Sequence, residues 1–113
     1  GRAPSSQRHN GIRMKTELTH LLFCLAEECG ELQQDIGKAG RFGVFDIRPH
    51  TSASNWDTMR NELHDIVAIY EMLCTLLRED TILDREMVEA KKIRVLKYME
   101  YARDRQQLGL LEM

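Results

Sequence analysis

Apolar residues recur with helical spacing in two separate stretches of the chain, and this repeat limits the fold more than any other feature. In the first stretch the apolar side chains are Leu18, Leu21, Leu22, Leu25, Cys29, Leu32 and Ile36. In the second they are Met59, Leu63, Ile66, Tyr70, Leu73 and Leu77. Intervals of three and four residues place each set on one face of an α-helix. The pattern predicts two long amphipathic helices, one over residues 15–36 and one that begins with Asn55 or Asp57 as N-cap and ends near residue 78.

A third segment opens with Thr81-Ile82-Leu83-Asp84, which is typical of a helix-capping box with Asp in place of Glu. Its apolar residues spread over more than one face, as in a helix that contacts two neighbours. No stretch shows a convincing strand pattern. The sequence therefore predicts an all-α bundle of three long helices, with a short extra helix between residues 46 and 55 as an option. Three helices leave part of the bundle uncovered, so we expect a homodimer or homotetramer to complete it.

Length and composition indicate one ordinary globular domain. Residues 1–13 lack both helical periodicity and the apolar core of a secretory signal, so we expect an added leader before a natural start at Met14. The domain is predicted over residues 14–105, followed by a tail over residues 106–113. A net charge of −2 gives no general attraction to a nucleic acid polymer or an anionic membrane. No apolar run approaches the roughly 20 residues needed to cross a bilayer.

The three cysteines, Cys24, Cys29 and Cys74, lie on or beside apolar stretches and lack the spacing of a zinc site. Free cysteine packs as a small hydrophobic side chain, so we expect buried, reduced thiols. Reduced thiols favour a cytoplasmic location.

Two pairs of acidic residues lie at the edges of the first two apolar stripes. Glu28 and Glu31 form one pair and Glu62 and Asp65 the other, and a separation of three residues makes each pair neighbours on a helix. Measured from Leu25 and Ile66, the stripe centres, Glu28 lies about 60° and Glu62 about 40° away, on the same rotational side. Carboxylates at the edge of a core are costly, and four converging ones repel one another. A divalent cation removes both penalties, so the pattern predicts a metal site.

The alternative is that the four acids are solvated charges on the flanks of two helices, which is the usual state of glutamate. Glu27 points away from the apolar stripe, and we expect it to face solvent or another subunit. His64, between the two acids of the second pair, is expected to be structural or solvated.

The order Glu27-Glu28-x-x-Glu31 followed by Glu62-x-x-Asp65 resembles the signature of the all-α nucleoside triphosphate pyrophosphohydrolases. This MazG-like superfamily includes phosphoribosyl-ATP pyrophosphatase and dimeric dUTPase. The resemblance covers residues 15–100. It implies a hydrolase that cleaves a nucleoside triphosphate between the α and β phosphates, giving a monophosphate and pyrophosphate. The catalytic and metal-binding residues would be Glu28, Glu31, Glu62 and Asp65, with Mg²⁺ as the cofactor and Mn²⁺ as a substitute.

Two basic groups are candidates for binding the phosphates of the substrate. Lys38 and Arg41 stand among glycines in a predicted loop, where they would neutralise phosphate oxygens while Phe42 offers an apolar surface to the base. A lysine after the first acidic motif also resembles the pattern of the family. Lys91 and Lys92 belong to a basic cluster on the third segment and would reach a triphosphate if that helix packs beside the metal site. The alternatives are an ordinary surface loop and a solvated helix face.

Two other functions are compatible with the same residues. A regulatory protein that binds nucleotide and metal without turnover would release no pyrophosphate. A non-catalytic helical dimerisation module would show no effect of divalent ions on its melting temperature. The sequence does not specify the base or sugar of the nucleotide.

Overall fold

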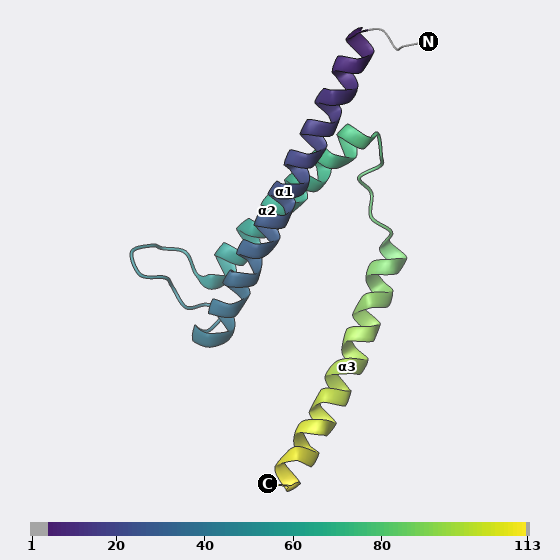
Figure 1. Cartoon of the computed structure of the whole chain (residues 1–113). Helices are drawn as coiled ribbons and strands as arrows, with labels where there is room; N and C mark the ends of the chain where they lie inside the picture. Colours follow the sequence, from purple (N-terminus) through teal and green to yellow (C-terminus); the bar gives the residue numbers. More distant parts are fainter. Residues whose placement is uncertain (1–4, 113) are drawn as a thin grey trace. The chain divides into compact units, whose positions relative to one another are not determined.

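The computed structural model describes residues 5–112, with side chains described for residues 11–106. Three α-helices follow one another along the chain: α1 (Ser5–Phe42), α2 (Asn55–Leu77) and α3 (Arg85–Glu112) (Figure 1). Within this part of the chain no strand forms, and extended pairing is limited to one isolated bridge between Ile47 and Ser54. The predicted all-α fold with three long helices is confirmed.

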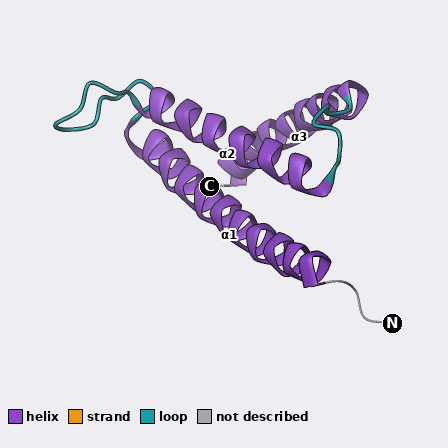
Figure 2. Ribbon diagram, turned by 90° about the horizontal axis from the view of Figure 1, so that it is seen from above, coloured by secondary structure: helices purple, strands orange, loops and turns teal. Residues whose placement is uncertain are grey.

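The chain divides into two compact units, Gly1–Thr81 and Ile82–Met113. In the first unit, α1 and α2 run antiparallel and pack along each other, joined by a loop over residues 43–54 (Figures 1 and 2). The second unit consists of α3 and the segment that leads into it. The antiparallel pair is the part of the fold that positions the candidate site.

Helix α1 is longer at both ends than the apolar stripe predicts. It includes residues 5–13, which belong to the predicted leader, and it continues through Gly37 and Gly40 to Phe42. The expected end at or soon after Gly37 is wrong, because a glycine costs a helix only about 1 kcal/mol and does not by itself end it. The helix ends where Gly43 adopts a φ of 107°, a conformation that favours glycine, and donates its N–H to the carbonyl of Ala39 at 2.9 Å.

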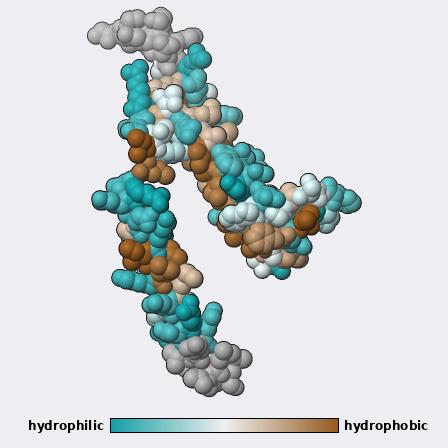
Figure 3. Space-filling model, turned by 180° about the vertical axis from the view of Figure 1, so that it is seen from behind, coloured by the Kyte–Doolittle hydropathy of each residue, from teal (hydrophilic) through white to brown (hydrophobic). Residues whose placement is uncertain are grey.

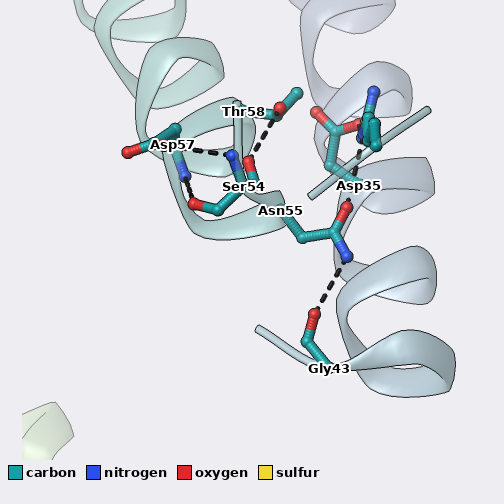
Figure 4. Close-up of polar contacts among 7 residues, drawn as sticks. Asp35, Gly43, Ser54, Asn55, Asp57 and Thr58 are labelled. Atoms are coloured by element: carbon teal, nitrogen blue, oxygen red, sulfur yellow. Dashed lines mark hydrogen bonds and ion pairs between the residues drawn. The ribbon is translucent and has the colours of Figure 1, made fainter. Parts of the chain in front are cut away.

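Helix α2 starts from a capping box formed by Ser54 and Asp57. The Ser54 hydroxyl accepts the N–H of Asp57 at 3.1 Å, and the Asp57 carboxylate accepts the N–H of Ser54 at 3.1 Å (Figure 4). The predicted N-caps were therefore wrong: Asp57 is the partner of the cap, and Asn55 is the first helical residue. At the other end Arg78, with a φ of 56°, donates its N–H to the carbonyls of Cys74 and Thr75 and closes the helix.

The loop over residues 43–54 contains no helix, so the optional extra helix between residues 46 and 55 is wrong. Its backbone is held instead by hydrogen bonds across the loop. Asn55 N donates to Asp46 O at 2.9 Å, and Trp56 N donates to Val44 O at 2.8 Å. These bonds tie the first part of the loop to the start of α2.

Helix α3 is capped by Asp84, whose Oδ1 accepts the N–H of Glu86 at 2.9 Å and of Met87 at 3.3 Å. Thr81 is not the cap, because the helix begins at Arg85, directly after Asp84. The Thr81 carbonyl accepts the hydroxyl of Tyr70 at 3.3 Å. The helix continues to Glu112, so the predicted tail is helical from residue 106 to residue 112.

Few apolar side chains are buried. Among the described residues the buried apolar set is Ala39, Leu73 and Cys74. Phe23, on α1, remains 71% exposed, and apolar side chains are visible on the surface in Figure 3. Cys24 is half-buried and Cys29 exposed, so the prediction of a buried thiol holds fully only for Cys74; all three are free thiols. No described helix is long and apolar enough to cross a membrane.

Candidate metal centre

Three carboxylates from α1 and α2 meet where the two helices pack. One oxygen each of Glu28, Glu62 and Asp65 can be chosen so that all three lie within 4.8 Å of one another. Glu28 and Glu62 are half-buried and Asp65 is exposed. We call these three residues the carboxylate cluster. Their convergence follows from the rotation of each helix, since packing the two apolar stripes together brings the same flank of each helix to the contact.

Two oxygens in the carboxylate cluster have no hydrogen-bond partner. The Oε2 atoms of Glu28 and Glu62 are both buried from solvent and unpaired. Leaving a buried acceptor unsatisfied costs about 1–3 kcal/mol, and more when the group is charged. A cation with oxygen ligands would satisfy both atoms, so the donor set fits a hard divalent ion.

The surroundings of Glu62 raise its pKa from 4.5 to about 8. The main cause is the hydrogen bond that protonated Glu62 can form with the carboxyl of Glu28, followed by burial, by a hydrogen bond with Glu31 and by the charges of Glu28 and Glu31. Glu31 therefore lies beside the cluster, although it is exposed and is not one of the three converging residues. Without a cation, the site favours a proton on Glu62 at neutral pH.

The metal-free protein should lose stability as the pH rises through about 8. The folded-state pKa of Glu62 is raised above its unfolded value, so the folded state binds more protons between about pH 4.5 and about pH 8. The resulting stabilisation is complete below the unfolded pKa and is lost above the folded one. Urea unfolding at pH 5, 7 and 9 in the presence of a chelator measures this loss.

Glu62→Gln is the matched variant for that experiment, because it removes the titrating group and keeps its size. The difference in unfolding free energy between the wild type and Glu62→Gln should change with pH as Glu62 titrates. A difference that stays constant from pH 5 to pH 9 would show that the carboxyls of Glu28 and Glu62 do not interact.

The basic residues predicted in a loop lie on the last turns of α1 instead. Lys38 is half-buried and lies seven residues after Glu31, which places it within about 20° of Glu31 around the helix and about 10 Å along it. Arg41 is turned about 80° from Glu31 by the same geometry, and measured from Glu28 the angles are about 80° for Lys38 and about 140° for Arg41. Its guanidinium carbon lies 5.2 Å from the ring centroid of Phe42, which is 63% exposed. Lys38 thus lies closer than Arg41 to the face of α1 that carries the carboxylates.

The remaining predicted residues are exposed. Lys91 and Lys92 lie on α3, where Lys92 Nζ donates to Glu89 Oε1 at 3.0 Å. They belong to the second unit, and their contact with a triphosphate stays a prediction. Glu27 and His64 are both exposed, in agreement with the sequence.

The structure also contains a buried polar network near the cluster that the sequence did not predict. Arg48, in the loop, donates through Nη2 to Oδ1 of Asp35 on α1 and through Nε to Oδ1 of Asn55 on α2, the latter at 3.3 Å. Asn55 Nδ2 in turn donates to Gly43 O at 2.9 Å (Figure 4). Asp35 is 6% exposed and Asn55 is 1% exposed. We call Asp35, Arg48 and Asn55 the Arg48 bridge.

One sequence signal could have pointed to two members of this network. Asp35 is seven residues after Glu28, and Asn55 is seven residues before Glu62, so each lies on the same helix face as a cluster residue. Arg48, which bonds both Asp35 and Asn55, lies in an irregular loop, so no helical spacing in the sequence points to it.

Comparisons of the chain with protein-family models, curated proteins and solved structures give no match.

Proposed function

We propose that the protein is a Mg²⁺-dependent nucleoside triphosphate pyrophosphohydrolase of the MazG-like kind, which converts a nucleoside triphosphate to a monophosphate and pyrophosphate. The observation that carries the proposal is the convergence of Glu28, Glu62 and Asp65 with two buried, unpaired oxygens. Mg²⁺ is held in proteins by a few carboxylates together with substrate phosphates, and this cluster offers such a partial ligand set.

The carboxylate cluster would hold the ion, with Glu31 beside it as a fourth ligand. Bound Mg²⁺ supplies charge stabilisation at the phosphate oxygens and lowers the pKa of a coordinated water. In the reaction, the water oxygen bonds to the α-phosphorus, the bond from that phosphorus to the α,β-bridging oxygen breaks, and pyrophosphate leaves with the bridging oxygen. A carboxylate of the site accepts the proton of the attacking water.

The residues toward the end of α1 would bind the rest of the substrate. Lys38 lies on the same face of α1 as Glu31 and about 10 Å from it along the axis, a distance that an extended triphosphate and a lysine side chain together can span. Lys38 and Arg41 would hold the leaving pyrophosphate, and exposed Phe42 would contact the base. Lys91 and Lys92 are further candidates for the phosphates, from α3.

Screening nucleoside triphosphates for Mg²⁺-dependent pyrophosphate release tests the proposal. We expect release from at least one nucleotide and none in the presence of a chelator. Metal-dependent nucleotide binding without release would instead identify a regulatory protein. No binding of nucleotide and no response to divalent ions would identify a helical dimerisation module.

We also propose that the protein is a cytoplasmic homodimer or homotetramer. The exposed apolar side chains of α1 and α2 support the oligomer, and the three free thiols support a reducing compartment. Light scattering at micromolar concentration measures the mass of the particle. A monomer mass would contradict the oligomer.

A further inference from the structure

Two helical turns from the carboxylate cluster, the Arg48 bridge again brings one polar residue of α1 together with one polar residue of α2. Glu28 faces Glu62 across the contact between α1 and α2, and Asp35 and Asn55 are each displaced from these residues by seven positions toward the loop. Seven residues advance an α-helix by about 10 Å and return to nearly the same face. The two polar layers therefore lie on one continuous face of the helix pair.

Arg48 connects the two helices directly at the second layer. Its guanidinium donates to Asp35 on α1 through one nitrogen and to Asn55 on α2 through another. The Arg48 side chain is 26% exposed and that of Asp35 is 8% exposed, so this ion pair is largely removed from solvent. A planar guanidinium that bonds both helices fixes their separation and register more strictly than apolar contacts do.

The carboxylate cluster needs such an external restraint. Glu28 and Glu62 each bury an oxygen without a hydrogen-bond partner where α1 and α2 meet, and separation of the helices would return both oxygens to water. Buried apolar contact close to the cluster is limited: Leu73 and Cys74 lie in the second half of α2, away from the loop, and Ala39, on the loop side, is a small residue. The Arg48 bridge opposes the separation on the loop side.

We propose that Asp35, Arg48 and Asn55 are positioning residues that set the affinity and selectivity of the metal centre. The inference rests on the proposed function, because it requires that the carboxylate cluster binds a cation. Mg²⁺ demands a nearly ideal octahedron with ligand distances of about 2.0–2.1 Å, whereas Ca²⁺ accepts flexible geometry at about 2.3–2.6 Å. Loosening the bridge should therefore weaken Mg²⁺ binding more than Ca²⁺ binding.

Titration calorimetry of the full-length protein with Mg²⁺ alone and with Ca²⁺ alone tests this inference. For Arg48→Gln, whose side chain is too short to reach both helices, we expect the Kd for Mg²⁺ to rise at least about tenfold and the Kd for Ca²⁺ to rise less. Arg13→Gln is the matched control, because it breaks the exposed Arg13–Glu17 ion pair of α1 far from the cluster. Its affinities should equal those of the wild type.

A double variant, Asp35→Asn with Arg48→Gln, separates positioning from stability. It leaves no unpaired buried charge, so its melting temperature should lie closer to the wild type than that of Arg48→Gln, while its Mg²⁺ affinity stays reduced. If Arg48→Gln does not fold, the Mg²⁺ affinity of the double variant tests the inference in its place.

Three results would overturn the inference. One is a Kd for Mg²⁺ within twofold of the wild type in the folded variants. Another is an equal loss of Mg²⁺ and Ca²⁺ affinity that follows the loss of melting temperature. A wild-type protein that binds neither ion would overturn the metal centre and this inference together, whereas the first two results leave the metal centre intact.

Discussion

Replacing Glu28, Glu62 or Asp65 by its amide should reduce Mg²⁺-dependent pyrophosphate release by at least about a hundredfold. Each amide keeps the size of the side chain but removes a charge that the cation requires, and even outer-shell changes at metal sites cost about 10–100-fold. Glu31→Gln should cause a comparable loss, since its carboxyl lies close enough to affect Glu62. Steady-state assays of the four variants measure the effect.

Glu27→Gln is the matched control on the same helix. Its side chain is exposed, so both activity and unfolding free energy should stay near the wild-type values, the latter within about 0.5 kcal/mol. At pH 9, where Glu62 is ionised, the metal-free cluster variants should be no less stable than the wild type, because each loses a repulsive charge. If Glu28→Gln, Glu62→Gln and Glu27→Gln retained equal activity, the carboxylate cluster would not be the catalytic metal site.

Addition of Mg²⁺ or Mn²⁺ should raise the melting temperature of the wild-type protein. An ion that binds the folded state alone, at a hundredfold excess over its Kd, adds about 2.7 kcal/mol to the free energy of unfolding. For a chain of this length that corresponds to a rise of roughly 10 °C. Thermal scans with and without millimolar MgCl₂, at an ionic strength held constant with NaCl, measure the shift.

Glu62→Gln is again the control for this thermal shift. It removes a central ligand, so its melting temperature should respond much less to Mg²⁺ than that of the wild type. An unchanged wild-type melting temperature in millimolar Mg²⁺ would argue for solvated acids at this position, as in the alternative interpretation of the sequence.

The helices and the core of the site could be predicted because both depend on periodicity. Apolar spacing identified α1 and α2, and the same rotation placed Glu28 and Glu62 on flanks that meet when the stripes pack. Asp65 completes the cluster because it lies three residues from Glu62. These relations are local in sequence, and they need only one assumption, that the two stripes face each other.

Helix ends and loop partners could not be predicted in the same way. Gly37 and Gly40 suggested a break, but each costs a helix little, and α1 continues through both. Lys38 and Arg41 therefore lie on the helix and not in a loop. The contacts of Arg48 depend on the path of an irregular loop between two helices. No repeat in the sequence encodes that path, so only the structure shows the pairing of Arg48 with Asp35.

The two polar layers also determine where the chain can change length during evolution. One residue inserted between Glu28 and Asp35 would rotate the layers about 100° apart on α1, and one between Asn55 and Glu62 would do the same on α2. The carboxylate cluster and the Arg48 bridge would then no longer share a face. In the outer part of the loop, around the turn at residues 49–52, an insertion would leave both helical registers intact. Length variation in descendants of this chain should accordingly be concentrated at that turn, while the two helical spacings of seven residues stay fixed.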